Sequence, residues 1–188
     1  MRIANTIGLS LTLLTLASGL TACGTAPKTA ADRRVLTADV DAFIMSLKES
    51  DPSIAKYFDS AEGYAAYPSI GKGGLIIGGA FGHGEVFSKG GTLIGYSDLT
   101  QGSIGAQIGG QSFGEIVFFE TQEALSNFKN GNFVLAATIS AVAVSAGAAA
   151  EAKYDHGVVV FLTKAKGLMA EASVGGQQLG YRSVADFE

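Results

Sequence analysis

The stretch that decides the fold runs from Tyr64 to Phe119 and reads YAAYPSIGKGGLIIGGAFGHGEVFSKGGTLIGYSDLTQGSIGAQIGGQSFGEIVFF. Short apolar runs alternate there with glycine-bearing turns, at a spacing that predicts antiparallel strands. Glycines also occur inside the apolar runs, as in Gly78-Gly79 and Gly109-Gly110. A glycine within a strand usually marks a bulge, a bend or the close approach of another group. The stretch therefore predicts a strongly bent sheet with patches that carry no side chain.

Composition narrows the class of protein. The chain has 188 residues, of which 47% are hydrophobic and 16% charged, and this excludes a disordered chain. The 26 glycines are about twice the usual share of ~7%. The formal net charge is −4 and no arginine-rich run is present, so the overall basic field that binds nucleic acid is absent. Any contact with anionic lipid must come from a local cluster of basic residues.

Residues 1–22 predict a lipoprotein signal peptide. Ile7–Leu20 is an apolar run too short to span a bilayer, which takes about 20 residues, but it suits the core of a signal peptide. The sequence LTAC that ends at Cys23 then matches the bacterial lipobox, in which the cysteine thiol accepts a diacylglyceryl group. The alternative is an ordinary secretory signal followed by a chance cysteine. Gly24 follows in place of an aspartate, which by lipoprotein sorting rules favours the outer membrane, facing the periplasm.

Residues 23–34 are polar and predict a tether between the lipid and a single domain over residues 35–188. The tether contains three basic residues, which either belong to a solvated linker or add attraction to anionic headgroups: Lys28, Arg33 and Arg34. Apolar residues recur at helical spacing from Leu36 to Leu47, which predicts an amphipathic helix. This helix either packs on the domain's own sheet or lies in a membrane interface.

Further elements are predicted on both sides of the glycine-rich stretch. Asp51-Pro52 predicts the start of a second short helix. Thr121 predicts the cap of a third helix, which ends at Gly131. Residues 133–150 are almost uncharged, but alanine, serine and glycine dominate them. We therefore favour a buried strand there over a membrane span.

The last part of the chain completes the predicted fold. Val158–Leu162 and Leu168–Val174 predict two more strands, joined by a turn over residues 164–167. The tail from Tyr181 to Glu188 supports no prediction. The predicted fold class is α+β, with a curved, antiparallel, glycine-rich and barrel-like sheet covered by short helices.

Several motifs resemble those of one known family, the SYLF domain, also called the lipid-binding SYLF or BPFT domain. PSIGKGGLIIGGAFGHGEVF, GYSDL and GAQIGGQSFGEIVFF are similar to its successive motifs, and TKAKGLMAEASVGGQQL to its closing one. The resemblance covers roughly residues 55–182. It implies a lipid-binding domain, because eukaryotic members of the family bind phosphoinositide membranes. Some members also bind actin, a property that we do not carry over.

The sequence contains no complete motif for catalysis or for metal binding. A Walker loop requires lysine followed by serine or threonine, but Lys72 is followed by glycine. Neither His83 nor His156 has a partner at the spacing of zinc ligands. Three acidic residues are interpreted as hydrogen-bonded carboxylates rather than as groups of a hydrolase: Glu85, Asp98 and Glu115. We therefore expect no enzyme activity, no cofactor and no metal.

The candidate site for lipid headgroups consists of lysines on glycine-flanked turns: Lys72, Lys89, Lys164 and Lys166. The backbone N–H groups of such turns can form an anion nest, and lysine adds positive charge. If two of these turns share one end of the sheet, they form a site for an anionic or phosphoinositide-like headgroup. Otherwise the lysines only keep the protein soluble.

The sequence thus favours a membrane-anchored, non-enzymatic lipoprotein that binds phospholipid at the cell envelope. In this interpretation the glycine-stripped strand faces admit an acyl chain while the turn lysines hold the headgroup. The alternative is a structural outer-membrane lipoprotein that binds a protein partner.

Overall fold

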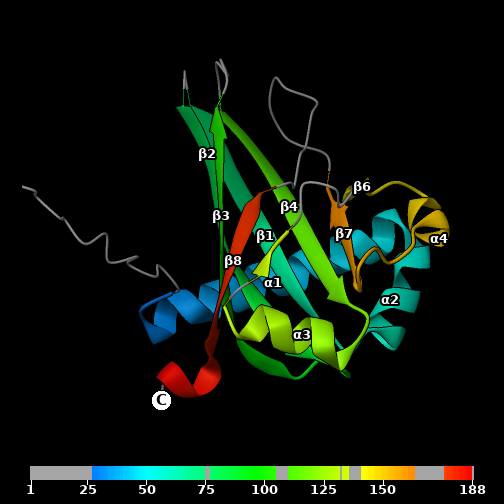
Figure 1. Cartoon of the computed structure of the whole chain (residues 1–188), viewed down its shortest axis with the longest axis horizontal. Coiled ribbons are helices and arrows are strands. Elements are labelled where there is room, and N and C mark those ends of the chain that lie inside the picture. The colour runs from blue at the N-terminus through cyan, green and yellow to red at the C-terminus, as the bar shows by residue number, and fades with distance from the viewer. Residues whose placement is uncertain are drawn as a thin grey trace, which may run out of the picture.

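The computed structural model describes residues 27–74, 77–104, 110–131, 133–135, 141–163 and 176–187. Within them, eight strands form one sheet in the order β5-β8-β3-β2-β1-β4-β7-β6 (Figure 1). Four long strands make its centre: β1 (Gly63–Gly74), β2 (Ile77–Ser88), β3 (Leu93–Ile104) and β4 (Gly110–Phe119). Four short strands flank them: β5 (Phe133–Val134), β6 (Ala141–Ala143), β7 (Val158–Leu162) and β8 (Gln177–Ser183).

The sheet is open but strongly curved. Three strands separate β8 from β4, which would place these two roughly 19 Å apart in a flat sheet with about 4.8 Å between strands. Yet Nε2 of Gln177 on β8 donates to Oε2 of Glu115 on β4 at 2.9 Å. The predicted class, α+β with a curved glycine-rich sheet, is confirmed. Two details differ, because the sheet does not close into a barrel and the β6–β7 pair is parallel.

Helices cover both faces of this sheet (Figure 1). One face packs against four elements: α1 (Ala30–Ser50), the 3-10 turn η1 (Pro52–Ile54), α2 (Ala55–Ser60) and α4 (Ala148–Glu151). The other, concave face packs against α3 (Gln122–Lys129). A short 3-10 turn, η2 (Val184–Phe187), follows β8. We call these two surfaces the α1 face and the α3 face.

Helix α1 forms because its amino-terminal end is capped and one of its sides is apolar. Thr29 Oγ1 accepts from the N–H of Asp32 at 3.1 Å, and the Asp32 carboxylate accepts from the N–H of Thr29 in return. The buried side chains recur at helical spacing: Leu36, Val40, Phe43 and Leu47. The predicted amphipathic helix therefore packs on the domain's own sheet. It begins at Ala30, so residues 30–34 of the predicted tether are helical.

Other local predictions have mixed outcomes. The cap of α3 is confirmed, since Thr121 Oγ1 accepts from the N–H of Ala124 at 3.1 Å. The predicted single strand over residues 133–150 is wrong, because its described parts form β5, β6 and α4. The predicted turn at 164–167 and strand at 168–174 lie outside the described residues. No helix in the described part of the chain is long and apolar enough to cross a membrane.

Glycines within the strands are the places where other side chains pack directly on the backbone. A Cβ atom at Gly84 would lie 2.6 Å from the Tyr67 ring and equally close to the Ala66 carbonyl oxygen. The same close approach occurs in three more pairs: Gly82 with Ile70, Gly95 with Tyr181, and Gly114 with Phe43. The predicted approach of other groups is confirmed at these positions. The protein's own side chains fill the patches, so these four sites leave no room for an acyl chain.

Candidate functional site

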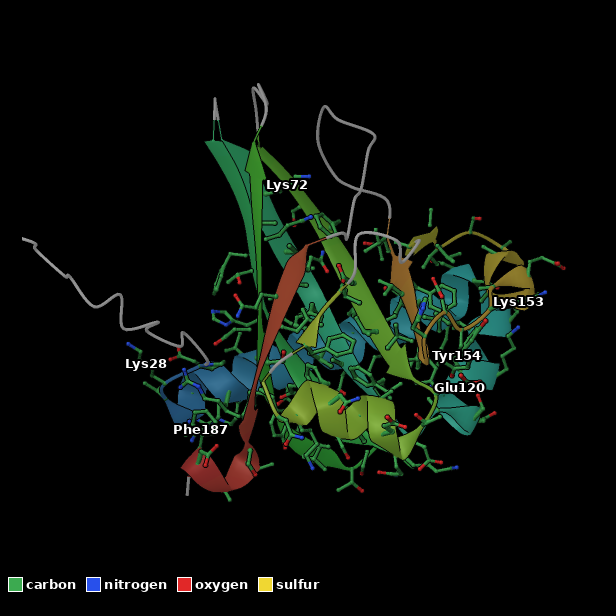
Figure 2. The ribbon with its side chains drawn as sticks, viewed as in Figure 1. Lys28, Lys72, Glu120, Lys153, Tyr154 and Phe187 are labelled. Carbon is green, nitrogen blue, oxygen red and sulfur yellow. The ribbon has the colours of Figure 1, made fainter. Side chains whose placement is uncertain are left out.

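The structure separates the two described lysines of the predicted headgroup site. Lys72 pairs with Ala80 near the far end of the β1–β2 hairpin (Figure 2), whereas Lys89 follows Ser88 at the opposite end. The span from Gly63, the partner of Ser88, to Lys72 is roughly 30 Å at about 3.3 Å per residue. The predicted turn at Lys72 is wrong, because this residue lies within β1 and pairs with both neighbouring strands, and the two lysines do not share one end of the sheet.

Lys89 is engaged in an ion pair, and the other predicted site residues are not described. The Lys89 ammonium forms an ion pair with Glu62, with 2.8 Å between Nζ and Oε1. Its positive charge is therefore already partly neutralised. Cys23, Lys164 and Lys166 lie outside the described residues, so their predicted roles stay predictions.

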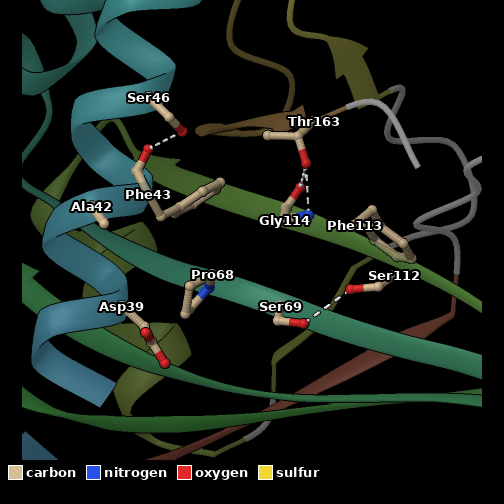
Figure 3. Close-up of a pocket in the computed structure, with 10 residues that line it drawn as sticks. All are labelled: Asp39, Ala42, Phe43, Ser46, Pro68, Ser69, Ser112, Phe113, Gly114 and Thr163. Atoms are coloured by element: carbon tan, nitrogen blue, oxygen red, sulfur yellow. Dashed lines mark hydrogen bonds between the residues drawn. The ribbon is translucent and has the colours of Figure 1, made fainter. Parts of the chain in front are cut away.

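A groove runs along α1 on the α1 face of the sheet (Figure 3). Its inner part, with a volume of about 560 Å³, lies between α1 and strands β1 and β4. Its amino-terminal part, of about 470 Å³, lies between the first turns of α1 and His83 of β2. Asp39 lines both parts, so they meet at this residue. We call the whole hollow the α1 groove.

Local sequence explains why the groove is open. Residues of α1 at intervals of three and four form its wall: Asp32, Leu36, Asp39, Phe43 and Ser46. Its floor contains the irregular part of β1, where the register shifts between Ala66 and Ser69. Pro68 lies within this shift and has no backbone N–H to pair with a neighbouring strand. The bulge thus interrupts the sheet where the helix passes over it.

Hydroxyl groups dominate the polar lining of the inner part (Figure 3). The Oγ atoms of Ser69 and Ser112 lie 3.0 Å apart, and Thr163 Oγ1 accepts from the N–H of Gly114 at 2.7 Å. Each hydroxyl offers one donor and two acceptor sites, so these contacts leave hydrogen-bonding capacity free. Asp39 is the charged residue among the lining side chains. Its exposed carboxylate accepts no hydrogen bond from the part of the chain that the structure describes.

The amino-terminal part combines charge with apolar surface. Its charged residues are Lys28, Asp32 and Asp39, and the exposed side chain of Val35 lies among them. The Lys28 ammonium forms no ion pair within the described residues. His83 also lines this part, and its Nδ1 lies 2.8 Å from Oδ1 of Asp98. A ligand that complements this surface needs both signs of charge and an apolar portion.

Two glutamates are wholly buried, one on each face of the sheet. On the α1 face, Glu85 Oε1 accepts from the hydroxyl of Thr37 at 2.6 Å, and burial raises the pKa of Glu85. On the α3 face, burial raises the pKa of Glu115 to about 8, against a stabilising hydrogen bond from Gln177 to the charged form. Asp98 is hydrogen-bonded too, to His83, so each of the three sheet acids takes part in a hydrogen bond.

A further hollow, of about 570 Å³, lies between α2 and the segment that joins α4 to β7. Its lining includes Glu120, Lys153 and Tyr154 (Figure 2). Lys56 also lines it, but donates to the carbonyl of Ala150 at 2.9 Å, so that part of its hydrogen-bonding capacity is used. Within the described residues, no three or more His, Cys, Asp and Glu side chains are arranged to hold a metal ion.

Sequence reasoning identified the helix that forms the wall of the groove but missed the groove itself. The available signal was the helical spacing of Asp32 and Asp39 with the apolar stripe, which places two acids beside the side that packs on the sheet. The serines of the floor come from strands far apart in the sequence, and no local pattern marks them.

The chain is similar to one known family over its carboxy-terminal part. Residues 100–186, which contain β4, α3, β7 and β8, match the family described as Ysc84: Las17-binding protein actin regulator. The predicted resemblance to the SYLF (Ysc84) family is therefore confirmed over these residues. The match to this family supports a lipid-binding domain.

One relative is the protein named Beta cell expansion factor A from Aeromonas veronii. It is 26% identical to this chain over 153 residues. The aligned region covers 81% of this chain and 58% of the relative, so the chain spans little more than half of that protein.

Proposed function

We propose that the protein is a non-enzymatic, lipid-binding lipoprotein of the bacterial cell envelope that binds phospholipid headgroups, anionic ones included. A diacylglyceryl group on Cys23 anchors it, on the outer membrane and facing the periplasm. The proposal combines the family, which supports lipid binding, with the lipobox and the glycine after Cys23. Phospholipid is the partner, and neither nucleic acid nor a cofactor has a part.

The observation that carries the proposal is that the α1 groove begins only a few residues after Cys23 in the sequence. Pro27 lines the groove and follows Cys23 by four residues, which span at most about 14 Å when fully extended. A lipid on Cys23 would therefore hold the amino-terminal part of the groove near the bilayer surface. Lys28, Arg33 and Arg34 lie at the same end of α1, where they would face anionic headgroups.

A vesicle-binding experiment tests the proposal without the anchor. Both hydrophobic clusters consist of residues from Leu36 onward, so a chain that begins at Gly24 retains its whole described core. We expect this chain to sediment with anionic vesicles and to release them as salt rises, because salt screens exposed charges over ~10 Å at 0.1 M.

Two double substitutions, each of which removes two positive charges, show which surface of the protein contacts the vesicle. Lys28→Gln with Arg34→Gln should weaken binding more than tenfold, because each basic residue near an anionic surface contributes about 1 kcal/mol. Lys129→Gln with Lys153→Gln removes the same charge from other elements and should have little effect. A chain that binds no vesicle of any composition would overturn the proposal and favour a lipoprotein that binds a protein partner.

A further inference from the structure

We propose that the α1 groove selects zwitterionic headgroups that carry a phosphate and a primary ammonium, that is, phosphoethanolamine. Lys28 meets the phosphate, and Asp39 meets the ammonium where the two parts of the groove join. The inference rests on the proposed lipid-binding function and assigns to it one class of headgroup.

The charges of the groove favour such a ligand over an anionic one. Its amino-terminal part has one cation, Lys28, and two carboxylates, Asp32 and Asp39. Asp32 is already engaged, because its Oδ2 accepts from the Thr29 hydroxyl at 2.7 Å. Asp39 is exposed and has no hydrogen-bond donor among the described residues. A purely anionic headgroup would leave this carboxylate next to like charge, whereas an ammonium compensates it.

The surroundings of Asp39 suit a primary ammonium better than a quaternary one. A primary ammonium has three N–H donors, and Asp39 shares the inner part with the hydroxyls of Ser46 and Ser69, which can accept them. A quaternary ammonium has no donor and is recognised instead by exposed aromatic faces. The two aromatic side chains of the inner part are nearly buried, with Phe43 7% and Phe113 5% exposed.

The apolar portion of a phospholipid has a contact surface in the amino-terminal part of the α1 groove. Val35 is 62% exposed although it is a large hydrophobic residue, and it lines the groove between Lys28 and Asp39. Along the helix, Asp32 and Asp39 are roughly 10 Å apart at about 1.5 Å per residue. This length accommodates a headgroup, with Val35 beside the first atoms of the acyl region.

Two kinds of vesicle test the assignment with the chain that begins at Gly24. Both contain the same fraction of anionic lipid, and the remainder is either phosphatidylethanolamine or phosphatidylcholine. We expect the unmodified sequence to bind the ethanolamine vesicles roughly tenfold more tightly, the size of one hydrogen bond between charged groups. Asp39→Asn should abolish this preference and leave binding to choline vesicles unchanged. Glu49→Gln removes an exposed charge from the same helix and should keep the preference.

A soluble competitor separates a headgroup site from an effect of bilayer packing. Glycerophosphoethanolamine should displace the chain from ethanolamine vesicles, and glycerophosphocholine should not. Equal binding to both vesicles, or a preference that survives Asp39→Asn, would overturn the inference while leaving lipid binding intact. Absence of binding to every vesicle would overturn the proposed function and the inference with it.

Discussion

The two faces of the sheet share the same four central strands but differ in how completely they are filled. On the α3 face, Tyr67 covers Gly84, and its hydroxyl lies 2.6 Å from Oγ of Ser97. On the α1 face, a groove of about 560 Å³ remains open beside Phe43. Strand glycines therefore serve packing, mostly on the concave face, and ligand space arises instead where a helix passes over a bulged strand.

The largest effect expected from this difference concerns the glycines. Gly84→Ala should destabilise the protein by about 3 kcal/mol, at the upper end for overpacking, because the new Cβ meets both a ring and a backbone oxygen. Gly114→Ala should cost less, because its neighbour Phe43 lines the groove and its ring can move into open space. Urea unfolding of the chain that begins at Gly24 measures both.

A third glycine serves as the control for this pair. A Cβ at Gly102 would have no heavy atom within 4 Å, so Gly102→Ala should stay within about 0.5 kcal/mol of the original stability. Equal losses for Gly84→Ala and Gly114→Ala would contradict the difference between the faces.

The second effect concerns the buried acid of the α3 face. The pKa of Glu115 is raised to about 8 when the protein is folded, against an ordinary value of 4.5. Between these two values the folded chain keeps a proton that the unfolded chain has lost. The stability that Glu115 contributes should therefore be full below pH 4.5 and fall by about 1.4 kcal/mol per pH unit as the pH rises to about 8. Glu115→Gln should remove this slope and be more stable than the original at pH 8.

The hydrogen bonds around Glu115 give a reason for the retained proton. Oε1 of Glu115 and Oε1 of Gln177 are both buried without a partner in the described residues. A protonated carboxyl carries no charge that would need compensation, and its Oε2 still accepts from Nε2 of Gln177. Tyr67 is the other titratable group that senses Glu115.

Urea unfolding at pH 5, 6.5 and 8 measures this slope. Glu85→Gln on the other face is the matched comparison. Burial raises the pKa of Glu85 too, against a hydrogen bond from Thr37, so Glu85→Gln should change the slope in the same direction. A slope that persists in Glu115→Gln would assign the pH dependence to other groups.

The elements that sequence patterns predicted are those with a local signature. The apolar stripe from Leu36 to Leu47, the cap at Thr121 and the continuous apolar run of β7 each lie within a few residues. Gly82 and Gly84 were correctly interpreted as sites of close approach. Which side chain approaches, however, depends on partners elsewhere in the chain, as with Tyr181 against Gly95.

The contacts between distant strands depend on the curvature of the sheet, which no local sequence pattern predicts. Glu115 and Gln177 are far apart in the sequence and meet because the sheet bends over three intervening strands. The α1 groove likewise combines Asp39 of α1 with Ser69 and Ser112 of two different strands. The glycines around Lys72 predicted a turn where β1 continues, and no local pattern indicated that Lys72 and Lys89 lie at opposite ends of one hairpin.

The smallest effect on stability and binding is expected at Lys89, at one end of the β1–β2 hairpin. The Lys89 ammonium forms an ion pair with Glu62. Its hydrogen bond to the carboxylate is the main cause that lowers the pKa of Glu62, and a hydrogen bond from Gln122 lowers it further. The lysine side chain is 55% exposed, so Lys89→Gln should change stability no more than ordinary surface substitutions do. Binding to anionic vesicles should also stay unchanged, because the charge is already compensated.

Lys72 offers the matched change in the same hairpin. Its ammonium forms no ion pair within the described residues, so Lys72→Gln removes an uncompensated charge from the far end of β1. If the glycine-flanked lysines contribute to headgroup binding, Lys72→Gln should weaken vesicle binding and Lys89→Gln should not. If both changes weaken binding equally, Lys89 also contacts the headgroups, and its ion pair with Glu62 does not prevent this contact. Equal binding by both and by the unmodified chain would leave the amino-terminal end of α1 as the basic surface that meets lipid.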